Sequence, residues 1–347
     1  MEEFHIDEPF QLENGQSLSG IKIAYHTYGN LNDNADNVVW ICHALTANSN
    51  VTRWWPGMVG ENHIINPQTH FIVCANILGS CYGTSGPLSE DPGTGKIYFS
   101  HFPAITIRDM VQAHILLRKQ LGIRRIALLM GGSMGGYQAL EWCVMEPEII
   151  RDLFLIATSA AETAWGIAVH TAQRLAIEAD PGWKDLNEDA GSGGLKAARA
   201  IGILTYRNYM IMKEKQADPD PEKLDHFRAS SYINYQGDKL VERFNAYSYW
   251  LLTKAMDTHN LSRGRGGDLK KVLSSMRQRT LIIGITSDIL CPLDEQKFIS
   301  DYIPDCKMIS IDSIYGHDGF MVESDKIADG LKKWINLTSS VFPDNNP

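Results

Sequence analysis

The sequence has few of the features that mark membrane or secreted proteins. Its 347 residues contain no apolar run long enough to cross a bilayer. The first eight residues, MEEFHIDE, are acidic and lack both the basic and the apolar region of a secretory signal peptide. We therefore predict a soluble, cytoplasmic protein with no membrane partner.

Cysteine is scarce, and metal-binding patterns are missing. The six cysteines form no C-x-x-C pair, and a chain of this length does not need disulfides to stabilise its core. We expect them to be reduced and structural. The sequence has no H-E-x-x-H motif and no paired Cys/His spacing, so we predict neither a metal site nor a cofactor. The cysteines are Cys42, Cys74, Cys81, Cys143, Cys291 and Cys306.

Positive charge is also in deficit. Lys and Arg number 32 against 41 Asp and Glu, which gives a formal net charge of −9. Nucleic-acid binding needs a basic surface that neutralises phosphates, so we exclude nucleic acid as a partner. The segment Gly93-Thr-Gly-Lys96 lacks the upstream glycine and the following Ser/Thr of a phosphate-binding loop, and we discount it.

One stretch combines the patterns of a strand, a sharp turn and a helix. An apolar run from Ile126 to Met130 stops at two glycines, and helical spacing begins soon after Ser133. The motif Gly131-x-Ser133-x-Gly135 has the form of a nucleophile elbow, in which small residues allow the backbone to expose the serine hydroxyl. An ordinary glycine loop is the alternative that the motif alone leaves open. With this strand and helix around it, the motif predicts Ser133 as a nucleophile at a helix N-terminus, where free N–H groups favour an oxyanion.

Strand and helix patterns alternate over most of the chain. Strands separated by helices imply a mostly parallel sheet with helices on both faces, an α/β fold. Thr106 is a plausible N-cap for a helix from Ile107 to Leu121. The expected strands are 21–28, 38–42, 71–76, 126–130, 153–157, 281–285 and 308–311.

The strand pattern disappears between about Ser159 and Gly267. This stretch lies between two expected strands of the sheet, so we interpret it as a helical lid insertion, residues 159–267, in a core domain formed by 1–158 and 268–347. Sites in open α/β sheets lie at the carboxyl ends of the strands, where such a lid would sit. The insertion is expected to contain the helices Ile167–Glu178, Gly194–Met212, Pro221–Ser230 and Lys239–Met256.

A catalytic serine needs a base, and the base needs an orienting acid. In enzymes with a nucleophile elbow the chain order is Ser, then Asp or Glu, then His. Asp288 follows the strand 281–285, and His317, in a glycine-flanked loop, is the only histidine after position 259. The order therefore predicts a triad of Ser133, Asp288 and His317. His43 precedes the serine and is expected to shape a loop. Three aspartates remain rivals for the acid: Asp294, Asp301 and Asp312.

Further motifs extend over nearly the whole chain, from about Leu12 to Leu337. With them the sequence resembles the homoserine O-acetyltransferase family of α/β-hydrolase-fold acyltransferases. The motifs that carry the resemblance include HALT (43–46), WW (54–55), LGSCYGTSGP (78–87), GGSMGG (131–136), YR (206–207), AMD (255–257), SDILCP (287–292) and YGHDGF (315–320).

The resemblance implies the α/β-hydrolase fold and a two-step acyl transfer. Ser133 would take an acetyl group from acetyl-CoA and pass it to the side-chain hydroxyl of L-homoserine, a step in methionine synthesis, by a ping-pong mechanism. The partners implied are these small molecules, with acetyl-CoA as a substrate rather than a cofactor. The resemblance also suggests a homodimer built through the helical insertion.

The same resemblance implies roles for four binding groups. The backbone N–H groups of Leu45 and Met134 would form the oxyanion hole, and the elbow geometry asks independently for the second of these. Arg207 would pair with the carboxylate of the acceptor through its planar guanidinium, and Asp318 with its ammonium group. Taken without the resemblance, Arg207 reads as a surface ion pair and Asp318 as a loop cap.

Departures from the family pattern leave alternatives open. Tyr247 stands where an asparagine is frequent in the family, and Cys291 where a tyrosine is. The alternatives are a succinyl-CoA donor, a serine acceptor, or a serine carboxylesterase of the same fold. Arg207 and Asp318 discriminate among them, because an esterase for neutral esters does not need that pair. A non-catalytic binding protein is disfavoured by the intact set of serine, acid and histidine.

Overall fold

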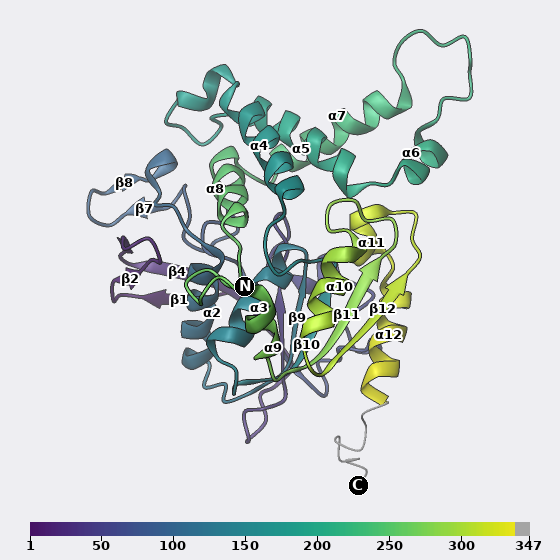
Figure 1. The fold of residues 1–347 in the computed structure, drawn as a ribbon. Helices are drawn as coiled ribbons and strands as arrows, with labels where there is room; N and C mark the ends of the chain where they lie inside the picture. Colours follow the sequence, from purple (N-terminus) through teal and green to yellow (C-terminus); the bar gives the residue numbers. More distant parts are fainter. Residues whose placement is uncertain (337–347) are drawn as a thin grey trace.

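The computed structural model describes residues 1–336 and is built on an eight-stranded sheet (Figure 1). The strand order is β1-β4-β6-β5-β9-β10-β11-β12. Pairing is antiparallel between β1 and β4 and between β4 and β6, and parallel between all later neighbours. The strands are β1 (Glu2–Ile6), β4 (Ile21–Tyr28), β5 (Val38–Cys42), β6 (Phe71–Ala75), β9 (Ile126–Gly132), β10 (Ile150–Ile156), β11 (Arg279–Ile285) and β12 (Cys306–Ile311).

All the strands expected from the sequence are present, and β1 is additional. β1 lies at the sheet edge with mostly exposed side chains, so it carries little hydrophobic signal. Two small hairpins lie outside the main sheet: β2 (Phe10–Gln11) with β3 (Ser17–Leu18), and β7 (Glu90–Asp91) with β8 (Lys96–Ile97). The discounted segment 93–96 covers the turn of the second hairpin and the first residue of β8.

Helices cover both faces of the sheet, and β5 shows how the sequence achieves this. Successive side chains of a strand point to opposite faces. Trp40 and Cys42 therefore lie in the core beneath α2 (Ile107–Gln120), α3 (Met134–Met145), α9 (Leu269–Ser274) and α10 (Leu293–Tyr302). Val39 and Ile41 lie in a second core with α1 (Val51–Trp54) and α12 (Ser324–Asn336). A strand buried on both faces needs the continuous apolar run that the sequence shows.

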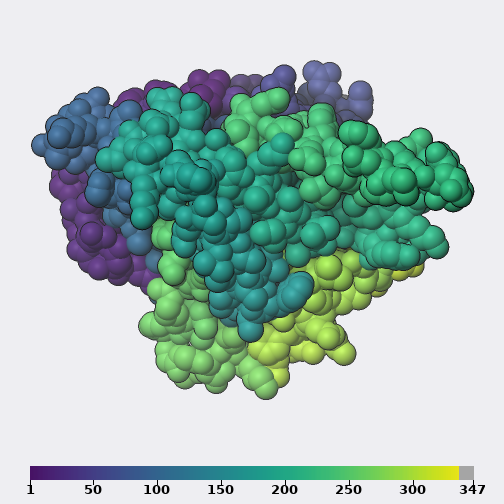
Figure 2. All heavy atoms as spheres, turned by 90° about the horizontal axis from the view of Figure 1, so that it is seen from above, coloured from purple at the N-terminus to yellow at the C-terminus, as the bar shows by residue number. Residues whose placement is uncertain are grey.

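The five helices of the insertion lie between β10 and β11 in the chain, above the carboxyl ends of the strands (Figure 1). From above, the teal-to-green insertion covers the middle of the molecule and extends to its right-hand edge, with core segments on the other sides (Figure 2). These helices are α4 (Ala164–Glu178), α5 (Ser192–Tyr206), α6 (Tyr209–Gln216), α7 (Arg228–Val241) and α8 (Ala246–Asp257). One short helical turn, η2 (Pro181–Lys184), lies inside the insertion, and three lie in the core: η1 (Phe99–His101), η3 (Gly316–Asp318) and α11 (Gly319–Val322).

Three of the predicted helices in the insertion were wrong in their limits. The predicted helix 194–212 is broken after Tyr206, because Arg207 is extended and the Asn208 side chain accepts the N–H of Met210 at 2.7 Å to cap α6. The predicted helix 239–256 is broken in the same way, where Asn245 caps α8. Asparagine at an N-cap satisfies free N–H groups and starts a new helix.

The predicted helix 221–230 does not form over most of its length. Residues 221–227 form a turn followed by irregular chain, and α7 begins only at Arg228. By contrast, Thr106 caps α2 as predicted, through a capping box with Asp109. All six cysteines are free thiols, as predicted. Among residues 1–336, none of the helices has the length and apolar character needed to span a bilayer.

Candidate active site

The elbow predicted around Ser133 forms between β9 and α3. Ser133 has φ 54° and ψ −128°, a conformation that costs a non-glycine residue of the order of 1–3 kcal/mol. Glycine is required on both sides of it. A Cβ at Gly131 would lie 2.1 Å from the carbonyl oxygen of Gly135, and a Cβ at Gly135 would lie 2.1 Å from that of Cys42. The glycines thus let the helix approach the strands closely enough to hold Ser133 in its strained turn.

Gly135→Ala is expected to lower the free energy of unfolding by about 2–3 kcal/mol, because the added methyl group would overlap a backbone oxygen that cannot rotate away. Urea unfolding monitored by circular dichroism measures this change. Gly93→Ala is the control: the nearest atom to its Cβ would be a side-chain oxygen at 3.3 Å in an exposed turn, and we expect less than about 0.5 kcal/mol. Equal effects of the two substitutions would contradict the close-packing explanation.

The structure brings Ser133, His317 and Asp288 together in one hydrogen-bonded chain. His317 Nε2 lies 2.9 Å from Ser133 Oγ, and His317 Nδ1 lies 2.7 Å from Asp288 Oδ2. All three side chains are buried. Ser133 lies at the end of β9, Asp288 in the loop after β11, and His317 on η3 after β12. The carboxyl ends of three strands thus deliver the three groups to one point, as the chain order predicts.

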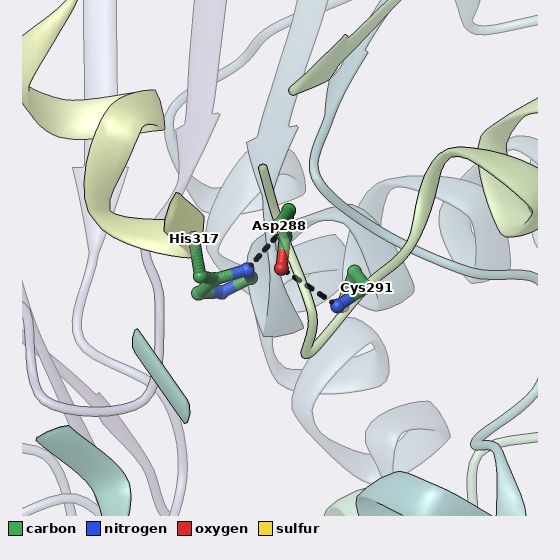
Figure 3. A group of neighbouring side chains, drawn as sticks. All are labelled: Asp288, Cys291 and His317. Atoms are coloured by element: carbon green, nitrogen blue, oxygen red, sulfur yellow. Dashed lines mark hydrogen bonds and ion pairs between the residues drawn. The ribbon is translucent and has the colours of Figure 1, made fainter. Parts of the chain in front are cut away.

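Asp288 is oriented by its own loop. Its Oδ1 accepts the N–H groups of Leu290 at 2.8 Å and Cys291 at 2.9 Å, which leaves Oδ2 for His317. Figure 3 shows the carboxylate between the imidazole and the backbone nitrogen of Cys291. None of the three rival aspartates contacts His317 within residues 1–336. Asp288 therefore fixes the ring so that Nε2 faces the serine.

The charges around His317 stabilise its protonated form, although the side chain is buried. Burial opposes the charged imidazolium, but the neighbouring carboxylate of Asp288 outweighs it and raises the pKa of His317 above its ordinary value. The imidazole can therefore accept a proton from Ser133 and hold it beside Asp288. This arrangement suits a general base that later acts as a general acid.

Cys291 also lies close to Asp288 and His317, and the three side chains offer donor atoms within 4.8 Å of one another (Figure 3). Metal binding would require the thiolate form of cysteine. Burial, followed by the charge of Asp288, raises the pKa of the Cys291 thiol well above its ordinary value. The carboxylate and the imidazole are already hydrogen-bonded to each other and to Ser133. We therefore assign these residues to the serine site and not to a metal site.

Ser133 opens into a cavity of about 720 Å³ between the core loops and the insertion. Its walls include Leu45 from the loop after β5, and residues of the insertion such as Arg199 and Tyr206. Within residues 1–336, the backbone N–H groups of Leu45 and Met134 donate no hydrogen bond to another group of the chain. Met134 is the first residue of α3, whose N-terminal N–H groups have no helical partner. Both N–H groups are thus available to a ligand oxygen.

Arg207 and Asp318 are brought together, but they pair with each other. Arg207 Nε lies 3.1 Å from Asp318 Oδ2. Burial raises the pKa of Asp318 above its ordinary value, although the guanidinium groups of Arg207 and Arg199 oppose that effect. Asp318 lines the cavity, whereas Arg207 does not. Arg207 thus pairs with the Asp318 carboxylate without lining the cavity itself.

Arg199 was not singled out from the sequence, yet it lines the cavity beside Asp318. Its guanidinium lies 5.5 Å from the centre of the Tyr206 ring, and its buried Nε has no hydrogen-bond partner among the described residues. Arg199 and Arg207 are eight residues apart in what reads as one helical pattern. In the structure Arg199 lies within α5, whereas Arg207 lies just past its end. The sequence pattern did not reveal this break in the helix.

His43 has a structural role, as the sequence suggested. It is fully buried, its Nε2 accepts the N–H of Ile77 at 3.1 Å, and its Nδ1 lies 2.9 Å from the carbonyl oxygen of Ala44. Burial lowers the pKa of His43 to about 4, so the ring is neutral near pH 7. It ties the loop after β5, which carries Leu45, to the loop after β6.

Comparison with known proteins identifies the family to which this chain belongs. Residues 37–324 match the family model of the alpha/beta hydrolase fold. The homoserine O-acetyltransferase of Cyclobacterium marinum is 44% identical over 331 residues, which cover 95% of this chain and 94% of that protein. The chain belongs to the homoserine O-acetyltransferase family. It is accordingly an enzyme of the acyltransferase class, and the predictions of the family, of the α/β-hydrolase fold and of an enzyme are confirmed.

Solved structures agree with this family assignment. The crystal structure of homoserine O-acetyltransferase from Bacillus anthracis has a TM-score of 0.86 and 25% identity, covering 95% of this chain and 96% of that one. Esterase E22 has a TM-score of 0.87 at 21% identity, covering 96% of this chain and 99% of that one. The second likeness concerns the fold alone. The fold therefore does not distinguish acyl transfer from ester hydrolysis, and the residues of the site have to do so.

Proposed function

We propose that this enzyme transfers an acetyl group from acetyl-CoA to the side-chain hydroxyl of L-homoserine, as a step in methionine synthesis. The observation that carries the proposal is the hydrogen-bonded chain of Ser133, His317 and Asp288, whose serine and histidine line a cavity together with Asp318 and Arg199. A hydrolase needs only the first three groups. The additional opposite charges suit an acceptor with an ammonium and a carboxylate group.

In the first step Ser133 Oγ attacks the thioester carbonyl of acetyl-CoA, and its proton passes to His317 Nε2. The N–H groups of Leu45 and Met134 stabilise the oxyanion that develops on the carbonyl oxygen. The C–S bond then breaks, and His317 returns its proton to the departing sulfur. CoA leaves as a free thiol, and Ser133 remains as an acetyl ester.

In the second step the hydroxyl of homoserine takes the place of CoA. His317 removes the hydroxyl proton, the oxygen attacks the acetyl ester, and the same N–H groups hold the oxyanion. The ester bond to Ser133 breaks, and the serine oxygen regains its proton from His317. Because CoA leaves before the acceptor reacts, the kinetics are expected to be ping-pong.

The acceptor is held at its two charged ends. Asp318, supported by Arg207, is the proposed partner of the ammonium group. For the carboxylate the geometry favours Arg199 over Arg207, since Arg199 lines the cavity and has no carboxylate partner within residues 1–336. A guanidinium can bind a carboxylate through two parallel hydrogen bonds.

Arg199→Gln is expected to raise the KM for homoserine by about 10–100-fold, the loss of one charge-assisted hydrogen-bonded pair. The rate of CoA release in the first turnover should change by less than about threefold. Arg207→Gln should act on the homoserine KM more weakly, because it removes only the support of Asp318. Steady-state and single-turnover thiol assays separate these effects. If Arg207→Gln raised the homoserine KM more than Arg199→Gln did, Arg207 would be the partner of the acceptor carboxylate.

The substrates themselves are tested by a four-way assay. Acetyl-CoA or succinyl-CoA is combined with L-homoserine or L-serine, and the free thiol is measured. We expect the highest turnover for acetyl-CoA with homoserine. A preference for succinyl-CoA or for serine would reassign the donor or the acceptor within the family. Thiol release that is fast and independent of any acceptor would favour a hydrolase.

We also propose that the homodimer forms through the insertion. Large apolar side chains are exposed on its helices, among them Trp165 and Leu175 on α4 and Leu204 on α5. Exposed apolar surface of this kind is typical of protein interfaces. Sedimentation equilibrium should give twice the chain mass, and a monomer at micromolar concentration would contradict the proposal.

A further inference from the structure

Three cations at the rim of the catalytic cavity have no role in the reaction described above. Arg53, Lys239 and Arg243 all line the cavity and are exposed. Within residues 1–336 none of these rim cations pairs with a carboxylate, whereas most arginines of the chain do. Asp318 is the only carboxylate among the lining residues. In a chain with a net charge of −9, this is a local excess of positive charge.

The rim cations come from both the core and the insertion. Arg53 lies on α1 of the core, Lys239 near the end of α7, and Arg243 just after it. Arg243 is fixed in place: its Nη1 donates to the carbonyl oxygen of Thr46 at 2.6 Å and to the hydroxyl of Tyr82. A ligand that engaged all three would therefore bridge the insertion to the loop that carries Leu45.

An aromatic surface lies beside them. Trp54 follows Arg53, is half-buried and also lines the cavity. Its indole stacks on Trp55 with the ring centres 5.4 Å apart and the planes 13° from parallel, and its Nε1 donates to the carbonyl oxygen of Asn48 at 2.8 Å. The indole is held rigidly, and a flat heterocycle can stack on such a ring.

The acceptor does not account for this charge. Homoserine is a zwitterion whose two charged groups are matched by Asp318 and Arg199, and the acetyl group is neutral. The donor does account for it, because CoA carries its thiol at one end of a long flexible arm and phosphates with an adenine at the other. The thioester must reach the buried Ser133, so the phosphates remain near the mouth.

We propose that the rim cations bind the phosphate groups of CoA and that Trp54 stacks against its adenine. The inference rests on the proposed function, in which a CoA thioester is the donor. Cationic side chains hold phosphates by charge-assisted hydrogen bonds, which arginine makes with particular geometric specificity. The rim thus selects a CoA thioester over simple acetyl esters, and it adds a function to residues that contact neither the reacting atoms nor the acceptor.

The kinetic test compares Arg53→Gln/Lys239→Gln with Arg124→Gln/Arg125→Gln. The control pair loses the same two charges at exposed positions before β9, at the opposite end of the strands. For each protein, kcat/KM is measured with acetyl-CoA and with S-acetyl-N-acetylcysteamine, a thioester without phosphates. The ratio of kcat/KM for acetyl-CoA to kcat/KM for the phosphate-free thioester should fall by about 10–25-fold in the rim variant. Each exposed ion pair contributes up to about fivefold in binding, and the variant loses two of them. The ratio should not change in the control variant.

A binding measurement tests the same site without catalysis. Titration calorimetry with adenosine 3′,5′-bisphosphate should show binding to the wild-type protein that weakens in the rim variant, in Trp54→Leu and with added salt. Binding of inorganic phosphate as tight as that of the nucleotide would overturn the proposal. An unchanged kinetic ratio in the rim variant would overturn it as well. If the proposed donor is wrong, the wild-type protein itself fails to use acetyl-CoA, which is a different result.

Discussion

Ser133→Ala is expected to reduce acyl transfer from acetyl-CoA to homoserine by about a million-fold in kcat, the scale seen when the nucleophile of a serine triad is removed. Ser133 Oγ is the atom that His317 Nε2 contacts at 2.9 Å, and both residues line the same cavity. The fold should survive, because alanine keeps the Cβ and removes only the hydroxyl. Free-thiol release measures the activity, and circular dichroism measures the fold.

Ser248→Ala is the matched control for that loss. Ser248 is fully buried, and its hydroxyl has no hydrogen-bond partner among the described residues. Removing it should change kcat by less than about threefold. If Ser133→Ala still formed a labelled acetyl-enzyme from acetyl-CoA, the nucleophile would lie elsewhere in the chain.

Asp288→Asn is expected to reduce kcat by about ten-thousand-fold, the effect of removing the orienting acid in serine triads. The two N–H groups of Leu290 and Cys291 can still hold the side-chain oxygen, so the backbone geometry is kept. The amide then presents a donor where His317 Nδ1 needs an acceptor. The imidazole takes the wrong tautomer, and its Nε2 can no longer accept the serine proton.

The pH profile of the same variant gives an independent readout. His317 acts as a base when neutral, so the rate falls as the pH falls through its pKa. Asp288 raises that pKa above the ordinary value of about 6.5, which sets the acidic limb of kcat/KM above that pH in the wild-type enzyme. In Asp288→Asn the limb should move to lower pH. Asp294→Asn, at an exposed position in the first turn of α10, should leave both the rate and the limb in place.

Residual activity near the wild-type level in Asp288→Asn would show that another carboxylate serves His317. Asp294, Asp301 and Asp312 were open to that role from the sequence. Among the carboxylates of residues 1–336, only Asp288 lies within hydrogen-bonding distance of the His317 ring, so we expect no other aspartate to replace it.

The parts of the site that depend on local sequence were the most predictable. The elbow around Ser133 could be predicted from the spacing of two glycines. Each glycine lies so close to a backbone atom that no side chain fits at its position. The order of Ser133, Asp288 and His317 follows from the way parallel strands end at one edge of a sheet. Continuous apolar runs such as that of β5 likewise follow from burial on two faces.

The parts that depend on contacts between distant segments were not predictable. Arg207 leaves its helical pattern because Asn208 caps a new helix and because Asp318, far along the chain, pairs with it. Arg199, eight residues earlier and within α5, lines the cavity. The rim cations look like ordinary exposed charges in the sequence, and only the packing of the insertion on the core brings Arg53 near Lys239 and Arg243 at one mouth.

The covalent intermediate on Ser133 is the most direct test of the proposed reaction. The wild-type enzyme is mixed with acetyl-CoA alone, quenched in acid and digested, and the peptides are weighed by mass spectrometry. Homoserine is then added to a second sample before the quench. We predict one acetyl group on the peptide that contains Ser133, formed with release of CoA and lost to O-acetylhomoserine when homoserine is added. Full-rate formation of O-acetylhomoserine with no acetyl group on the enzyme at any time would contradict the two-step transfer.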